Sequence, residues 1–313
     1  MHQKNVLITG GAGFLGSHLC EKILETGGKV AVLDSMDSGR MSNLHHIQER
    51  IDIFSGDMAD EHLVQVAGKG RNMVVHLAIP IAVRQQKFTL HHLETATKGF
   101  FNILDQCLKE KALLIHISSV AVYGNPQYTP VDEEHPLEPE TMYGAVKLAE
   151  EYYCRSFHKT SGLKYVILRV SDIYGPRNTP LSTPILFLRN AMENRPLTVF
   201  GQGTQGRTYT YVSDFVEAAL LAMEKETAQG STMNISSREF VSMLDLAEAV
   251  NMALGGTCQV IHDPTVPADE RKLDIEIKKA QTILGFEPKV DLAEGLRKTY
   301  AWMQNNSAYY STG

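Results

Sequence analysis

The sequence has little cysteine, no excess of positive charge and no long apolar run. Its four cysteines stand far apart, without the close pairs of a zinc or redox motif. We therefore expect reduced, buried thiols in a reducing compartment rather than disulfides or metal ligands. They are Cys20, Cys107, Cys154 and Cys258.

Acidic residues slightly outnumber basic ones, 36 against 30, for a net charge of -6. This balance disfavours a nucleic-acid partner, because such proteins are usually basic. No stretch is long and apolar enough for a membrane, and the first residues run into an apolar strand without a signal peptide. We therefore expect a cytoplasmic protein. The histidine doublets at 45–46 and 91–92 lack the one-turn spacing of paired ligands, so we expect no metal site.

Short β-rich runs alternate with helical patterns over the first half of the 313 residues. The runs are nearly all apolar, which is typical of strands covered on both faces. This alternation predicts an α/β fold with a Rossmann-type, doubly wound parallel sheet. The expected strands are 6–9, 30–34, 51–54, 73–77, 113–118 and 165–170, and the clearest helices are 14–25, 95–109 and 143–160.

The alternation of strands and helices changes after residue 175, where prolines and glycines interrupt it. A helix at 212–224 and a strand at 233–235 are expected to return to the main sheet. We therefore assign residues 1–175, with a return segment at about 209–237, to the large domain. Residues 176–208 and 238–305 form a smaller C-terminal α/β lobe, with helices at 243–254 and 293–303. Residues 306–313 are expected to be a flexible tail.

A glycine-rich turn follows the first strand. Gly10, Gly13 and Gly16 fit the pattern G-x-x-G-x-x-G, and Gly11 with the last two fits G-x-G-x-x-G. Glycines let the backbone turn tightly and approach a pyrophosphate, which rests on amides at a helix N-terminus. Because the turn lies between an apolar strand and a helix, it predicts a dinucleotide site rather than a mere connection.

Asp34 ends the second strand, about 20 residues further on, where a carboxylate can bind the adenosine ribose. The same charge would repel a 2′-phosphate, so the expected cofactor is NAD. Arg40 keeps NADP open as an alternative, and Asp34 could simply be a solvated acid. Asp57, next to Met58 after the third strand, could meet the adenine edge or cap the next helix.

Tyr143 and Lys147 are four residues apart on a predicted helix, which places them on one face. A tyrosine hydroxyl with its usual pKa of about 10 is a poor base at neutral pH. A lysine ammonium stabilises the phenolate, and the pair can then take a proton from a sugar hydroxyl. Ser119, at the end of an apolar strand, could orient that hydroxyl. The alternatives are surface decoration for the pair and strand-end capping for Ser119 and above all Ser118.

Further segments occur in one order along the chain. They are residues 8–16 (ITGGAGFLG), 76–78 (HLA), 117–119 (ISS), 122–124 (VYG), 143–147 (YGAVK), 168–169 (LR), 174–177 (YGPR) and 207–212 (RTYTYV). With them the chain resembles the extended short-chain dehydrogenase/reductase family, especially its nucleotide-sugar epimerases and dehydratases. The resemblance implies an NAD-dependent enzyme whose smaller lobe binds a nucleotide sugar. It also implies a homodimer formed through the helices around 95–108 and 143–157.

The resemblance also implies roles for individual residues. Ser119, Tyr143 and Lys147 match the catalytic triad. Arg207 matches an arginine that clamps the substrate diphosphate, as a guanidinium fork can, with a surface salt bridge as the alternative. The expected NAD contacts are Gly10, Gly13, Phe14, Leu15, Gly16, Asp34, Ser38, Gly39, Asp57, Met58, Leu77, Ala78, Tyr143 and Lys147. The expected substrate contacts are Ser119, Val120, Ala121, Asp172, Phe200, Arg207, Tyr209 and Arg271, of which Phe200 and Tyr209 approach the nucleotide base.

Four departures from the family pattern bear on the substrate. Ala96 and Asp172 each stand where relatives have asparagine, and Ile79-Pro80 stands where many have Ala-Gln. Val266 replaces an arginine, for which Arg271 is the candidate substitute.

Val120 and Ala121 also decide between reactions. The 4,6-dehydratases of the family carry an Asp-Glu pair here, because elimination of water needs an acid and a base. Two apolar side chains instead suit a keto sugar that must turn over, so we predict epimerisation at C4, with a UDP-hexose or UDP-hexuronate favoured. The alternatives are a dehydratase, decarboxylase, dehydrogenase or 4-keto-reductase, or an NAD-binding sensor without catalysis.

Overall fold

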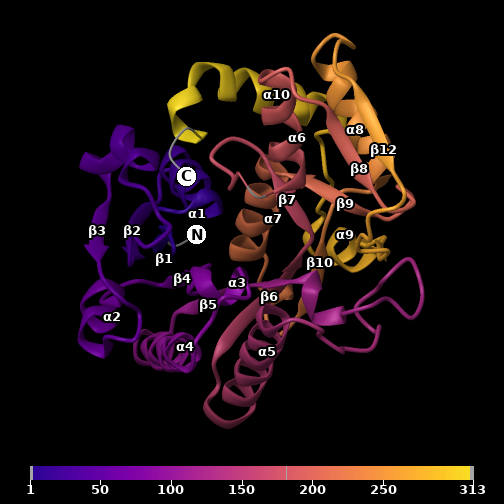
Figure 1. The fold of residues 1–313 in the computed structure, drawn as a ribbon. Coiled ribbons are helices and arrows are strands. Elements are labelled where there is room, and N and C mark those ends of the chain that lie inside the picture. Colours follow the sequence, from indigo (N-terminus) through magenta and orange to yellow (C-terminus); the bar gives the residue numbers. More distant parts are fainter. Residues whose placement is uncertain (1–2, 181, 311–313) are drawn as a thin grey trace.

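Seven parallel strands form the central sheet, in the order β3-β2-β1-β4-β5-β6-β10. The computed structural model describes residues 3–180 and 182–310. The strands are β1 (Asn5–Thr9), β2 (Lys29–Asp34), β3 (Asp52–Ser55), β4 (Met73–His76), β5 (Leu113–Ser119), β6 (Lys164–Val170) and β10 (Thr232–Ile235). The doubly wound α/β fold predicted from the sequence is thus confirmed (Figure 1).

The continuous apolar character of the strands has a direct cause in the packing. In β1, Val6 and Ile8 belong to one hydrophobic cluster, whereas Leu7 between them belongs to another. Successive side chains of a strand point to opposite faces, so both faces of this sheet are buried.

Two layers of helices cover these faces (Figure 1). One layer contains α1 (Phe14–Glu25), α7 (Val212–Glu224) and α9 (Lys278–Leu284). The other contains α2 (Glu61–Gly68), α4 (Leu90–Glu110) and α5 (Met142–Ser161). None of the helices in the described part of the chain is both long and apolar enough to cross a bilayer.

The smaller lobe is built from short strands that pair over long sequence separations. Its strands are β7 (Asp172–Tyr174), β8 (Leu197–Phe200), β9 (Gly206–Tyr211), β11 (Phe240–Ser242), β12 (Val260–Asp263) and β13 (Lys272–Leu273). β7, β11 and β13 each pair with β9, and β12 pairs with β8. Its helices are α6 (Thr183–Met192), α8 (Met243–Ala253) and α10 (Leu292–Asn305), which share one hydrophobic cluster with these strands.

Local chemistry moves some boundaries from those expected. The α4 helix begins at Leu90 rather than near residue 95, because Thr89 and His92 form a capping box before it. The shortest helical turns are α3 (Ile81–Arg84), η1 (Met41–Asn43), η2 (His45–Arg50), η3 (Val120–Tyr123), η4 (Glu226–Ala228) and η5 (Ser307–Tyr310).

The C-terminal tail differs from the flexible segment expected for residues 306–313. Residues 307–310 form η5, and the ring centroids of Tyr309 and Tyr310 lie 5.1 and 6.0 Å from that of Trp302. Aromatic packing therefore orders a segment whose polar composition suggested a loose end. Residues 311–313 lie outside the described residues.

The order of the strands in the sheet indicates where a ligand would bind. From β1 the chain proceeds to β2 on one side, and β4 lies on the other side of β1. In such sheets ligands bind beyond the carboxyl ends of the strands where the order reverses. The glycine turn after β1 and the segment after β4 meet at that point.

Candidate active site

The glycine turn has a backbone that side chains could not follow. Gly10 has a φ of +74°, a left-handed conformation that favours glycine. A Cβ on Gly16 would lie 2.3 Å from the carbonyl oxygen of Gly10, so the first turn of α1 approaches the loop too closely for any side chain. The loop is held to the sheet by the hydrogen bond from Gly10 N to Leu33 O at 2.8 Å.

The N-terminus of α1 is suited to an anion. Its N-cap is Gly13, which offers no side-chain hydrogen bond, and its first turn has no acidic residue. The amides of residues 14–16, Phe14 and Leu15 among them, therefore lack an intrahelical partner and carry the positive end of the helix dipole. These features fit the pyrophosphate of a dinucleotide.

Asp34 is positioned at the end of β2 by two backbone N–H groups. Its Oδ2 accepts from Ala12 N and its Oδ1 from Met36 N, both at 2.9 Å. Burial raises the pKa of Asp34 above its ordinary value, although the two hydrogen bonds oppose this shift. A carboxylate has further lone pairs with which to accept a ribose hydroxyl. The neighbouring backbone at Gly39 comes so close that a Cβ there would lie 2.5 Å from Asp34 Oδ1, and Ser38 beside it is exposed.

Arg40 has a partner of its own. Its guanidinium lies 4.3 Å from the ring centroid of Tyr309, and its Nη1 donates to Tyr309 O at 2.6 Å. A guanidinium engaged by the C-terminal segment is poorly placed to bind a 2′-phosphate. The structure thus favours NAD over NADP at this end of the site.

Asp57 and Met58 follow β3 in different environments. The carboxylate of Asp57 accepts the N–H two residues later, and α2 is capped by Asp60 instead. The capping role considered for Asp57 is therefore wrong, because Asp60 stands at the helix start. Asp57 is exposed, whereas Met58 is buried and fills the space beside Gly99, where a Cβ would lie 2.3 Å from Met58 Cγ.

Leu77 and Ala78 are held against the glycine turn. The hydroxyl oxygen of Thr9 accepts from Leu77 N and from Ala78 N at 3.3 Å. A Cβ on Gly10 would lie 3.1 Å from Ala78 N. The segment after β4 therefore packs directly against the glycine turn beyond β1.

Ser119 begins the η3 turn at the end of β5. Its Oγ accepts from Ala121 N at 3.1 Å, which leaves the hydroxyl proton free to donate to a ligand. Ser118 makes a different contact, donating to Glu151 Oε1 at 2.7 Å. The capping expected above all of Ser118 is thus found at Ser119, because the strand extends one residue further than predicted.

The start of α5 docks on this turn. A Cβ on Gly144 would lie 2.5 Å from Ala121 O, so the absence of a side chain there permits the close approach. Thr141 caps the helix by accepting from Gly144 N. Tyr143, next to Gly144, and Ala121 are partly exposed, whereas Val120 is buried.

Lys147 lies one turn further into α5 and is only 2% exposed. Its Nζ donates to Glu150 Oε2 at 3.0 Å. The sequence prediction did not include Glu150, although its spacing of three from Lys147 was a usable signal. It also missed His76 and His116, which face Glu150 from β4 and β5.

Four charged side chains of the smaller lobe form a network of ion pairs, called the bridge below: Asp172, Arg207, Asp269 and Arg271. Arg207 Nη1 lies 3.3 Å from Asp172 Oδ2, and Arg207 Nη2 lies 3.0 Å from Asp269 Oδ2. Arg271 Nη2 lies 2.6 Å from the same Asp269 oxygen. Hydrogen bonds from Arg271, opposed by burial, bring the pKa of Asp269 to about 2. The structure thus places both predicted arginines on one carboxylate that the prediction did not include.

A cavity of about 590 Å³ lies beside this bridge. It connects the loop before α5 with the loop before β13 and is lined by Asn125, Glu140, Asp269, Glu270 and Arg271. Glu140 precedes Tyr143 by three residues, just before α5 begins, and Arg271 belongs to both the cavity and the bridge.

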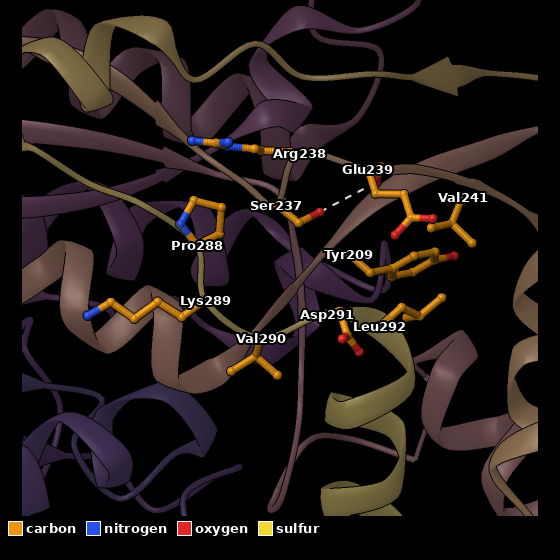
Figure 2. Close-up of a pocket in the computed structure, with 10 residues that line it drawn as sticks. All are labelled: Tyr209, Ser237, Arg238, Glu239, Val241, Pro288, Lys289, Val290, Asp291 and Leu292. Carbon is orange, nitrogen blue, oxygen red and sulfur yellow. Dashed lines mark hydrogen bonds between the residues drawn. The ribbon is translucent and has the colours of Figure 1, made fainter.

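Tyr209 and Phe200 lie in unequal surroundings. Tyr209 is 5% exposed and belongs to a second cavity of about 210 Å³, where Figure 2 shows it with Val241 and Leu292. Phe200 is 45% exposed at the end of β8. Gly201, which follows it, donates to the carbonyl oxygen of Val266 in the loop that carries Asp269 and Arg271.

A comparison with known families matches residues 6–236 to the NAD dependent epimerase/dehydratase family. A putative UDP-glucose 4-epimerase of Methanocaldococcus jannaschii is 31% identical, over 96% of this chain and 99% of that protein. UDP-glucuronic acid decarboxylase 1 of Xenopus tropicalis is 30% identical, over 95% of this chain and 71% of that protein.

Among solved structures, UDP-glucuronic acid 4-epimerase of Bacillus cereus, in complex with UDP-glucuronic acid and NAD, superposes with a TM-score of 0.87. It is 28% identical, over 96% of this chain and 99% of that one. The names of these relatives describe different reactions on nucleotide sugars. The glycine turn, the uncapped α1 and the matches over nearly the whole chain agree, and the chain belongs to the NAD-dependent epimerase/dehydratase family of nucleotide-sugar enzymes.

Proposed function

We propose that this protein epimerises a UDP-linked hexose or hexuronate at C4 through a transient 4-keto sugar. The observation that supports the proposal is the close approach of Gly144 in α5 to Ala121 in the η3 turn, because these residues neighbour Tyr143 and Ser119 in the chain. Lys147 lies on the same face of α5 as Tyr143.

Two side chains favour epimerisation over dehydration. Val120 and Ala121 carry no acid or base, whereas elimination of water from a 4-keto sugar requires both. Few polar groups in this turn would hold a keto sugar in one orientation. An intermediate that can present either face is the requirement for inversion at C4.

The residues divide the chemistry between them. Tyr143 accepts the proton of the C4 hydroxyl, and the Lys147 ammonium stabilises its phenolate. Ser119 donates a hydrogen bond to the same sugar oxygen. Bound NAD supplies the reversible hydride acceptor. Gly10, Gly13 and Gly16 admit its pyrophosphate, and Asp34 orients the ribose.

A panel of UDP-, dTDP- and GDP-sugars, with products identified by NMR, tests the proposal. We expect one UDP-sugar to be converted into its C4 epimer, with no net rise in the absorbance of reduced nicotinamide. A deoxy-keto product, release of carbon dioxide or net nicotinamide reduction would assign a dehydratase, decarboxylase or dehydrogenase instead. Absence of turnover on the whole panel would favour a sensor.

Arg207 is proposed to bind the substrate diphosphate. Phosphate oxygens would exchange with the carboxylates of Asp172 and Asp269 that hold this guanidinium in the ligand-free protein. We expect Arg207→Gln to raise KM roughly 10- to 100-fold, which corresponds to the loss of a charge-assisted hydrogen bond. The value of kcat should change much less, because the contact is made equally in ground and transition states.

Arg195→Gln provides the matched control. Arg195 is about half exposed and pairs with the single carboxylate of Glu193. Initial rates measured over a range of substrate concentrations should show wild-type KM for this variant. Equal KM values for Arg207→Gln and wild type would mean that Arg207 forms only a surface salt bridge.

A homodimer is proposed through α4 and α5. Phe101 of α4 is 36% exposed and Tyr152 of α5 is 55% exposed, although both are large apolar rings. We expect sedimentation velocity to give about twice the chain mass of 34.8 kDa. The double variant Phe101→Glu/Tyr152→Glu should sediment as a monomer, because buried carboxylates in such an interface lack partners. Met252→Glu, at an exposed methionine of α8, should leave the mass unchanged.

A further inference from the structure

A buried cluster of polar side chains surrounds Glu150 in α5, the helix that also carries the candidate base. β4 and β5 pair in register at His76 and His116, whose rings stack with centroids 5.7 Å apart. Neither histidine is exposed, and Phe100 of α4 packs on both, at 5.0 and 5.1 Å. Such positions usually hold apolar residues, so two adjacent imidazoles require an explanation.

Glu150 of α5 faces the two histidines. Its Oε2 lies 3.0 Å from Lys147 Nζ and 3.5 Å from His116 Nε2, and its Oε1 lies 3.9 Å from His76 Nε2. The carboxylate is only 2% exposed. Both histidine Nε2 atoms and Glu150 Oε1 are buried without a hydrogen-bond partner. The cluster is therefore assembled from three elements, with its polar atoms directed at one carboxylate.

The hydrogen bonds of Thr9 indicate the tautomer of His76. Thr9 Oγ1 accepts the backbone N–H groups of Leu77 and Ala78. Its own proton is then available to His76 Nδ1, at 2.8 Å. This assignment places the ring proton of His76 on Nε2, the nitrogen that faces Glu150.

The charges in the cluster follow from burial and proximity. Burial lowers the pKa of His76 and that of His116, which keeps both rings neutral. Burial would raise the pKa of Glu150, but Lys147 and the two histidines bring it to about 2. The site therefore contains one carboxylate and one ammonium, and the imidazoles contribute dipoles.

The two cysteines near Glu150 are neutral. Cys154 is on the next turn of α5, and burial raises its pKa well above the usual value. Cys107 of α4 interacts with Cys154 and has its pKa raised by burial in the same way. The charge of Lys147 is thus compensated within the cluster by Glu150.

The adjacent Glu151, in the same helix, is a buried carboxylate whose two oxygens both accept hydrogen bonds. It accepts from Arg169, Arg155 and Ser118 through both oxygens. Glu150 has instead one ion pair, with the candidate catalytic lysine. Ala96, where relatives have asparagine, is fully buried and offers no polar side chain.

We propose that Glu150 is a positioning residue, a buried counterion that holds Lys147 charged and in place on the Tyr143 face of α5. His76 and His116 act as neutral groups that solvate the carboxylate. The proposal rests on the proposed catalytic role of Lys147. It predicts that the charge of Glu150, and not only its shape, determines the pH range over which the enzyme works.

A metal ion is the alternative occupant of these residues. Ligand atoms of His76, His116 and Glu150 lie within 4.8 Å of one another. The ammonium of Lys147, 3.0 Å from the same carboxylate, would repel a divalent cation and competes with it for Glu150 Oε2. The Nε2 proton assigned to His76 also blocks that nitrogen as a ligand. The observations therefore favour the ion pair, and the metal content of the protein is one arm of the test.

The first arm compares kcat–pH profiles of Glu150→Gln and Glu150→Asp. Without its counterion a buried ammonium loses its proton more readily, so Glu150→Gln should lose activity at an alkaline pH about one unit or more below that of wild type. Glu150→Asp retains the charge and should retain the alkaline limb, with a lower kcat. A limb that does not move in Glu150→Gln would overturn the proposal.

The second arm needs neither substrate nor cofactor. In protein labelled with 13C at lysine Cε, the resonance assigned by its loss in Lys147→Arg should titrate at lower pH in Glu150→Gln than in wild type. This readout holds even if no nucleotide sugar is turned over, so the two proposals can fail separately. If the Lys147 resonance titrates identically in both proteins, Glu150 is not its counterion.

Thermal melting gives a third readout with a defined pH window. The pKa of Glu150 is about 2 in the folded protein, whereas an unfolded glutamate titrates at about 4.3. The charged carboxylate therefore stabilises the fold above the unfolded value, and this stabilisation is lost as the pH falls toward 2. The melting temperatures of wild type and Glu150→Gln should therefore differ at neutral pH and converge as the pH falls from about 4 toward 2. Glu151→Gln should also melt early but leave the Lys147 titration in place. One equivalent of zinc in purified wild type that is absent from Glu150→Gln would overturn the proposal, because it would show that these residues bind a metal ion.

Discussion

Tyr143→Phe is expected to lose about 10²- to 10⁴-fold in kcat, the range typical of a general base. The ring remains, and so does the contact between Gly144 and Ala121 that positions the helix. What disappears is the only group at this position that can take the C4 proton. The measurement is turnover of the substrate identified by the sugar-nucleotide panel, with NAD content determined on the same preparation.

Tyr153→Phe is the control for that substitution. Tyr153 is in the same helix, and its ring packs on Phe101 at a centroid distance of 4.9 Å. It should keep wild-type turnover after losing the same single oxygen. Wild-type kcat in Tyr143→Phe would refute the catalytic assignment, whereas loss of NAD together with activity would point to a binding role.

Glu151→Leu should have the largest effect on stability, about 3–5 kcal/mol. Glu151 is completely buried and accepts both Nε and Nη2 of Arg169, at 2.9 and 2.8 Å. Arg169 is itself only 2% exposed, so leucine would leave a buried guanidinium without an anion. The free energy of unfolding in urea measures the loss.

Glu294→Leu is the matched control. Glu294 pairs with Lys298 one turn away on α10 and is 41% exposed. An exposed pair of this kind contributes about 0.3–0.5 kcal/mol. The double variant Glu151→Leu/Arg169→Met should recover part of the loss, because it removes the unpaired charge as well. A loss below about 1 kcal/mol for Glu151→Leu alone would show that water reaches Arg169.

The glycine turn and the position of Asp34 could be located from the sequence because their signals are local. The glycine spacing, the apolar strand before it and Asp34 after the next strand all occur within one strand–helix–strand unit. The structure added the reason for Asp34, whose carboxylate is tied to the turn through Ala12 N. It also showed that Arg40 is engaged by Tyr309, a contact across 269 residues that no local pattern signals.

The bridge around Arg207 could be predicted only in part. The sequence indicated Arg207 and, as a substitute for the missing arginine at Val266, Arg271. It did not indicate that Asp269 joins them, because that contact depends on β13, a strand of two residues that pairs with β9. So short a strand has no periodicity of its own and forms only when its partner is already in place.

Composition, apolar runs and glycine spacing alone determined that this chain forms a doubly wound sheet with a dinucleotide turn. These properties follow from backbone sterics and from burial of neighbouring residues. The tertiary structure decided which charges meet: Glu150 with Lys147, His76 and His116, and Arg207 with Asp172 and Asp269. Ion pairing depends on distance in space and on exclusion of water, and both exist only after strands and helices far apart in the sequence have packed.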